Sequence, residues 1–258
     1  MNLLMDKVVL VSGGTAGLGA GIARAAGHHG SKVVVTGRKT ARGLELVAEL
    51  ETMGCETAFV KCDVGDVAQV RDAVTQTVQR FVRADCVVNS AGLTTRGDLT
   101  STTQELFDQH IAVNLRGPFF MIQAAAEDMV KRGEGGTIVN ILSIASHSGQ
   151  PYLAPYVAAK AGLAGLTKNL AHAQRWHRIR INGLNIVWTQ TDGEDEIQRR
   201  FHGAGDNWIS EAAKALPMGK LGQVDEIAEV VVFLLSERSG VVTGSIIDWD
   251  QVVVGAHD

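Results

Sequence analysis

Near its amino terminus the chain reads Val8-Val-Leu-Val-Ser12-Gly13-Gly-Thr-Ala-Gly17-Leu-Gly19. The first five residues form a short apolar run that predicts a buried strand, and the residues after Gly19 follow a helical pattern. Glycines between a strand and a helix let the backbone turn tightly and approach a pyrophosphate. The helix then offers unpaired N–H groups and its positive dipole end to the phosphates. This order therefore predicts a dinucleotide-binding fold, with the glycine spacing Gly-x3-Gly-x-Gly.

Apolar runs alternate with helical patterns along the whole chain, which is typical of a parallel sheet with helices on both faces. We predict seven strands, at 7–12, 32–36, 57–62, 84–89, 136–142, 179–186 and 244–249. Helices are predicted at 18–29, 40–53, 67–82, 103–132, 154–176, 194–203, 207–215 and 224–236. No linker-like stretch divides residues 1–258, so we expect one doubly wound α/β domain.

Composition narrows the class of protein. Hydrophobic residues make up 45% and charged residues 20% of the 258 residues, which is typical of a globular protein with a sizeable core. The formal net charge of −4 gives no reason to expect nucleic acid or a membrane surface as a partner. No secretory signal or membrane-spanning run is visible, so we expect a cytoplasmic protein. The three cysteines lack a paired CxxC spacing, and we expect no metal site.

A second motif carries groups suited to proton transfer. Ser143 ends the apolar run Thr137–Ser143, and Tyr156 and Lys160 follow four residues apart. In a helix that spacing leaves two side chains roughly 40° apart around the axis and about 6 Å along it. An isolated tyrosine has a pKa of about 10, and a nearby ammonium favours its deprotonated form. We therefore expect Lys160 to lower the pKa of Tyr156.

Together these motifs resemble the short-chain dehydrogenase/reductase family. The resemblance rests on Gly-x3-Gly-x-Gly, Asn89-Ser-Ala-Gly92, Asn114, Ser143 and Tyr156-x3-Lys160, which occur in the family's order. It implies a single Rossmann-type domain that transfers hydride between a nicotinamide cofactor and a carbonyl or secondary alcohol. It also implies a catalytic tetrad of Asn114, Ser143, Tyr156 and Lys160.

The resemblance further implies a set of cofactor-binding residues. In the family, the residue matching Asp63 holds the adenine amino group, Val64 packs on the ring, and Thr191 meets the nicotinamide carboxamide. Where the family has Pro-Gly, this chain has Ile186-Val187. The expected cofactor contacts are Gly13, Thr15, Gly17, Leu18, Gly19, Arg38, Asp63, Val64, Asn89, Ala91, Gly92, Tyr156, Lys160, Val187 and Thr191.

The turn after the second strand bears on which dinucleotide binds. An acid there would bond the free 2′-hydroxyl of NAD, but the chain has Gly37, followed by Arg38 and Lys39. An arginine suits a 2′-phosphate because its planar fork of donors matches the phosphate oxygens. We therefore expect NADP(H) to be favoured, with NAD(H) as the alternative.

The motifs say less about the residues that bind the substrate. Residues 189–217 mix acids, arginines and glycines, and we expect them to form a substrate lid. The lining candidates are polar and favour a sugar, polyol or keto compound as the small-molecule substrate. A non-catalytic dinucleotide sensor, or a dehydratase or epimerase on the same fold, remains an alternative. Small residues at 158–165 predict a homodimer or homotetramer. The substrate-pocket candidates are His147, Gln150, Trp188 and Gln190.

Overall fold

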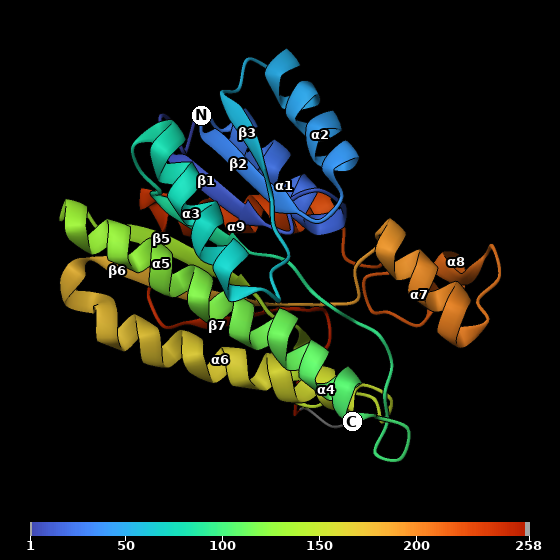
Figure 1. Cartoon of the computed structure of the whole chain (residues 1–258). Helices are drawn as coiled ribbons and strands as arrows, with labels where there is room; N and C mark the ends of the chain where they lie inside the picture. Colours follow the sequence, from blue (N-terminus) through green and yellow to red (C-terminus); the bar gives the residue numbers. More distant parts are fainter. Residues whose placement is uncertain (1, 256–258) are drawn as a thin grey trace.

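A computed structural model describes residues 2–255 and contains a seven-stranded sheet in the order β3-β2-β1-β4-β5-β6-β7 (Figure 1). All six strand pairs are parallel. This confirms the predicted seven-stranded parallel sheet. The strands are β1 Val8–Ser12, β2 Lys32–Gly37, β3 Thr57–Lys61, β4 Cys86–Asn89, β5 Gly136–Ile141, β6 Ile179–Ile186 and β7 Ile246–Trp249.

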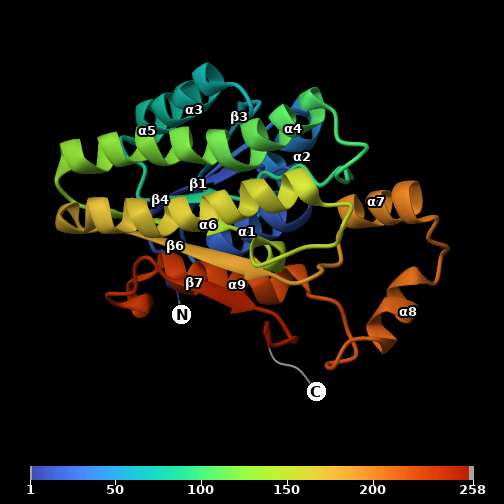
Figure 2. The same ribbon diagram turned by 90° about the horizontal axis from the view of Figure 1, so that it is seen from below.

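Helices cover both faces of the sheet because successive strand residues point to opposite sides. Val9 and Val11 pack in one apolar cluster with α1, α2 and α9, whereas Leu10 between them packs in the other with α3, α5 and α6. Figure 2 shows the two helix layers on either side of the sheet. The helices are α1 Gly17–His28, α2 Thr40–Thr52, α3 Val67–Phe81, α4 Gln104–Ile111, α5 Gly117–Arg132, α6 Ala154–Gln174, α7 Asp192–His202, α8 Trp208–Lys214 and α9 Val224–Leu235.

The predicted helix at 103–132 is interrupted. A π-helical segment, Ala112–Arg116, separates α4 from α5. The extra residue in this turn has an identifiable cause, since the Asn114 side chain exchanges two hydrogen bonds with the backbone of Leu93. Insertions of this kind are frequent at functional sites.

The segment that contains α7 and α8 stands apart from the layered body of the molecule in both views (Figures 1 and 2). It follows the carboxyl end of β6 and returns to the body at α9. Stacking of Trp188 on Trp208, with ring centroids 5.5 Å apart, ties α8 to the end of β6. None of the helices in residues 2–255 has the length and apolar run that crossing a bilayer requires.

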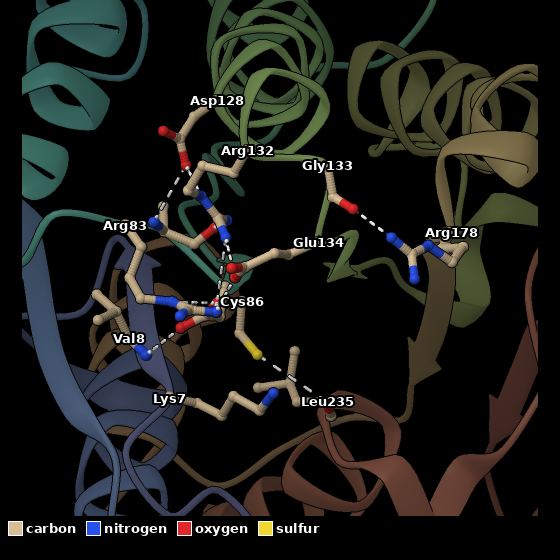
Figure 3. Close-up of polar contacts among 12 residues, drawn as sticks. Lys7, Val8, Arg83, Cys86, Asp128, Arg132, Gly133, Glu134, Arg178 and Leu235 are labelled. Carbon is tan, nitrogen blue, oxygen red and sulfur yellow. Dashed lines mark hydrogen bonds and ion pairs between the residues drawn. The ribbon is translucent and has the colours of Figure 1, made fainter.

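A buried carboxylate joins the amino ends of the central strands, opposite the site described below. Asp85 is 5% exposed, and it accepts a hydrogen bond from the backbone N–H of Val8 at 2.9 Å. Arg83 and Arg132 pair with this carboxylate and also meet Glu134, as Figure 3 shows for the two arginines and the glutamate. Because every charge in the cluster has a partner of opposite sign, the buried acid is compensated.

Candidate active site

The glycine loop between β1 and α1 closes against the loop after β4. Gly13 and Gly17 have φ values of 71° and 50°, in the left-handed region that favours glycine. A Cβ atom on Gly13 would lie 2.5 Å from the Cα atom of Ala91, so only glycine permits this approach. The two loops meet where the strand order reverses, between β1 and β4. Open α/β sheets bind their ligands at such a switch point.

Unpaired polar groups at this point fit a dinucleotide. Ser12 and Asn89 are register partners at the carboxyl ends of β1 and β4. The Ser12 hydroxyl oxygen and the Asn89 side-chain oxygen are buried without a hydrogen-bond partner among the described residues. Helix α1 also begins without a side-chain cap, which leaves its first N–H groups and its positive end for an anion. The helix end and the Ser12 hydroxyl therefore suit the pyrophosphate of a nicotinamide dinucleotide, whereas the Asn89 oxygen, which only accepts, suits a hydroxyl of the same cofactor.

A cavity of about 430 Å³ extends from this loop toward α7 and brings together three of the four predicted tetrad residues. Ser143 ends the segment after β5 and caps the short 3-10 turn Ile144–Ser146, while Tyr156 and Lys160 lie in the first turns of α6. The Lys160 ammonium donates to the carbonyl oxygen of Ile141 at 2.7 Å and lies 5.7 Å from the Tyr156 ring centroid. The predicted cofactor residues that also line the cavity are Gly13, Leu18, Gly19, Gly92, Val187 and Thr191.

The pKa values of this pair correct one expectation. Burial raises the pKa of Tyr156 to about 12, and a hydrogen bond from Ser143 only partly opposes this effect. Burial also lowers the pKa of Lys160 to about 8. The expected lowering of the Tyr156 pKa is therefore wrong for the protein alone, because the loss of water around the phenol outweighs the Ser143 hydrogen bond and the Arg96 charge, and Lys160 is not among the groups that shift it.

Asn114 lies beneath the cavity and is fully buried. Besides its bonds to Leu93, its side-chain nitrogen lies 3.2 Å from Nδ1 of His110, one helical turn earlier. Nε2 of His110 lies 3.1 Å from both the hydroxyl and the carbonyl oxygen of Thr95. A carbonyl only accepts, so Nε2 carries the proton and Nδ1 accepts from Asn114. The His110 ring meets Tyr156 edge-on at 6.2 Å, which makes it a site neighbour that the motifs did not indicate.

The predicted adenosine contacts lie at the neighbouring strand ends. Gly37 ends β2 beside Lys61, the last residue of β3, and Asp63 accepts a hydrogen bond from the N–H of Gly65 at 2.9 Å. Arg38 is exposed, and within residues 2–255 no hydrogen bond or ion pair holds it. A Cβ atom on Gly37 would lie 2.6 Å from the Thr15 hydroxyl oxygen, so the glycine loop and the β2 turn are in contact. These residues, with Val64, lie outside the lining of the cavity.

The substrate candidates divide into two groups. Gln150 and Trp188 line the cavity with the tetrad residues. His147 does not, because its Nε2 pairs with Asp248 of β7 at 2.9 Å. Gln190 lines a different cavity, between α1, α9 and α7. Among the further polar lining residues are three on α7 and one in a loop, which no short motif could indicate: Glu194, Gln198, His202 and Arg96.

Comparisons with known proteins agree with this arrangement. Residues 13–251 match the family model described as enoyl-(acyl carrier protein) reductase. The chain is 36% identical over 247 residues to an uncharacterised oxidoreductase of Thermotoga maritima, which covers 95% of this chain and 96% of that protein. It is 33% identical over 249 residues to L-rhamnose 1-dehydrogenase (NAD(P)(+)) of a Sphingomonas species, with 95% of each covered. The crystal structure of a variant actinorhodin polyketide ketoreductase with NADPH matches with a TM-score of 0.89 and 29% identity, covering 95% of this chain and 96% of that one.

The fold, the switch-point site and the relatives define a nicotinamide-dependent oxidoreductase of carbonyl or alcohol substrates. The chain belongs to the short-chain dehydrogenase/reductase family.

Proposed function

We propose that the protein transfers hydride between a nicotinamide dinucleotide and a carbonyl or secondary alcohol, with Tyr156 as the proton donor or acceptor. The observation that supports this most directly is the placement of Ser143, Tyr156 and Lys160 in one cavity beside the glycine loop. The nicotinamide would supply the hydride chemistry when bound.

Each tetrad residue has a role that follows from its contacts. The Ser143 and Tyr156 hydroxyls, which hydrogen-bond each other, would both donate to the substrate's oxygen and polarise it. With its pKa raised to about 12, Tyr156 keeps its proton near neutral pH and can give it to the developing alkoxide. Lys160 anchors on the Ile141 carbonyl, and its remaining N–H groups can hold the nicotinamide ribose. Asn114 uses its side chain to tie the π-helical segment to Leu93, which holds the floor of the site in place.

We favour NADP(H) over NAD(H). Arg38 follows β2 without a protein partner among the described residues, and Gly37 leaves no acid to repel a 2′-phosphate. The relative named with NAD(P)(+) and the ketoreductase structure with NADPH are compatible with this preference.

The substrate lid, the oligomeric assembly and the cytoplasmic location are also proposals. We propose that residues 189–217 act as a substrate lid, which Arg96 steadies through a 3.1 Å contact between its Nε and Nε2 of His202. Assembly into dimers or tetramers is proposed from the outer face of α6, discussed below. A location in the cytoplasm stays a prediction from the sequence.

The experiment that tests the function is an absorbance screen at the nicotinamide band. Purified protein is mixed with NADPH or NADH and ketones, or with NADP⁺ or NAD⁺ and alcohols, sugars and polyols. We expect absorbance to change with at least one substrate class, in step with product formation. Tight dinucleotide binding without turnover across the panel would instead favour a sensor. Product without a net change in absorbance would favour a dehydratase or epimerase.

A further inference from the structure

Helix α7 presents a polar stripe to the cavity. Glu194, Gln198 and His202 are spaced four residues apart and all line the cavity that contains Tyr156. This spacing keeps side chains on one face of a helix, about 40° apart from one to the next. Arg96 and Tyr152 line the same cavity, and Arg96 lies over the Tyr152 ring at 5.3 Å. The cavity therefore has a polar wall in addition to the tetrad.

The two charged residues of this wall lie within electrostatic reach of the reacting hydroxyl. Beyond the effects of burial and of Ser143, the Glu194 charge raises the pKa of Tyr156 and the Arg96 charge lowers it. A bound substrate whose oxygen meets Tyr156 would therefore extend between an anion and a cation.

Both charged groups retain hydrogen-bonding capacity. Glu194 accepts from Nε1 of Trp188 and from Nε2 of Gln198, each at 2.7 Å, and both bonds go to Oε1. Arg96 donates through Nε to His202 and through Nη1 to the Thr94 carbonyl at 2.9 Å. Glu194 Oε2 and Arg96 Nη2 have no hydrogen-bond partner in the part of the chain that the structure describes. The wall thus offers one charged acceptor and one charged donor.

From the charged acceptor and donor of this wall we infer that the substrate is a neutral polyhydroxylated compound, an aldose or a polyol. Glu194 and Arg96 then determine the enzyme's specificity by hydrogen-bonding substrate hydroxyls away from the reacting carbon. The inference rests on the proposed function. A hydroxyl both donates and accepts, so neighbouring hydroxyls can satisfy both charges. An acyl chain would displace water from the Glu194 and Arg96 charges and could not replace the hydrogen bonds that this water makes. A carboxylate substrate would gain Arg96 but be repelled by Glu194.

The first measurement compares substrates with the wild-type protein. Values of kcat/KM are obtained from nicotinamide absorbance for L-rhamnose, L-fucose, D-glucose and sorbitol, and for acetoacetyl-coenzyme A, pyruvate and cyclohexanone. We expect the best polyhydroxylated compound to exceed each of the other three by at least about tenfold, the scale of one charge-assisted hydrogen bond.

The second measurement assigns the residues. For the best sugar or polyol, kcat/KM is compared with that of each monodeoxy analogue, and the ratio cancels any effect of Glu194 on the pKa of Tyr156. Glu194→Gln should reduce the ratio by about tenfold for one analogue, because the hydroxyl it lacks is the one bonded by the carboxylate. Arg96→Met should do the same for a different hydroxyl. Glu196→Gln, on the exposed face of the same helix, is the matched control and should leave all ratios unchanged.

The outcomes separate this inference from the proposed function. If the thioester, keto acid or cyclohexanone is the best substrate, the inference is overturned while the oxidoreductase function stands. Unchanged ratios in folded Glu194 and Arg96 variants would also overturn it. An absence of turnover with every substrate would overturn the proposed function, and this inference with it.

Discussion

At the scale of single residues, burial shifts the pKa values of Tyr156 and Lys160 in opposite directions. Each shift favours the neutral form, toward about 12 for the phenol and about 8 for the ammonium. The surroundings therefore keep the Tyr156 phenol protonated, and they leave Lys160 close to losing its charge. As the pH rises, Lys160 therefore loses its proton before Tyr156 does.

We predict that kcat/KM for reduction falls as pH rises through about 8. The lowered pKa of Lys160 means that its charge, and with it one N–H donor, is lost above that pH, whereas Tyr156 remains protonated until far higher pH. When the dinucleotide is the varied substrate, the kcat/KM profile reports the free enzyme, so it should show the lysine. Lys160→Met should have low kcat/KM with no step near pH 8. A wild-type profile that stays level up to pH 10 would rule this assignment out.

His110 is a second residue with a specific expected effect. His110→Phe removes the acceptor of the Asn114 side-chain N–H, and an unsatisfied buried donor costs about 1–3 kcal/mol of unfolding free energy. Displacement of the floor of the site should lower kcat by roughly tenfold to a hundredfold. His110→Gln can still accept from Asn114 and should recover part of both losses.

Chemical denaturation and steady-state kinetics check this prediction, with exposed His172→Phe as the control. A purely structural role would lower stability without lowering kcat in the folded variant.

At the scale of elements, the strands and most helices could be predicted because short apolar runs alternate with segments of helical periodicity along the chain. The predicted helix at 103–132 shows where this reasoning stops. Asn114 was recognised as unusual within a helix, but its partner is the backbone of Leu93, 21 residues earlier. A π-helical insertion that depends on such a distant contact leaves no local pattern.

In the site, too, some residues could be predicted from local sequence and others depend on contacts between distant segments. The placement of Gly13, Tyr156 and Lys160 at one cavity could be predicted, because it depends on a glycine turn and on a fixed helical spacing. The polar wall could not, because Arg96 and Glu194 come to line one cavity only when α7 is packed beside the sheet. His147 stood close to Ser143 in sequence, yet Asp248 of β7 draws its side chain away from the cavity.

The turn after β2 carries the prediction on cofactor choice. We expect NADPH to bind roughly ten- to a hundredfold more tightly than NADH, because one charge-assisted contact is worth about 1.5–3 kcal/mol. Arg38→Ala should weaken NADPH binding and leave NADH binding nearly unchanged, and Arg80→Ala, at an exposed position of α3, is the control. Titration at fixed ionic strength measures this.

Equal or tighter binding of NADH by the wild-type protein would reverse the assignment to NAD. Gly37→Asp is a poor probe here, because its Cβ atom would collide with Thr15.

At the scale of the whole molecule, the solvent-exposed face of α6 consists partly of small residues. Ala158, Ala161 and Gly165 are exposed on one face of the helix, and a Cβ atom on Gly165 would meet nothing within 4 Å. Small residues allow two helices to approach closely, and in a two-fold symmetric dimer the same face of each subunit forms the contact.

We predict a homodimer or homotetramer, with this face at a two-fold contact. Gly165→Arg should shift the assembly toward monomers without unfolding the chain, because the position is open in the single protomer. Light scattering at micromolar concentration measures the mass, and circular dichroism verifies the fold. A wild-type monomer under these conditions, or a variant that keeps the wild-type mass, would reject the contact.

The central claim is that Tyr156 transfers the proton that accompanies hydride transfer, and its most direct test is the turnover of Tyr156→Phe. This variant removes one hydroxyl and should bind the dinucleotide as wild type does, yet lose at least about a hundredfold in kcat, the usual scale of general acid–base catalysis. Tyr152→Phe removes the hydroxyl of the chain's other tyrosine from the same cavity and should lose less than about tenfold. A Tyr156→Phe enzyme with turnover within a few-fold of wild type would contradict the mechanism.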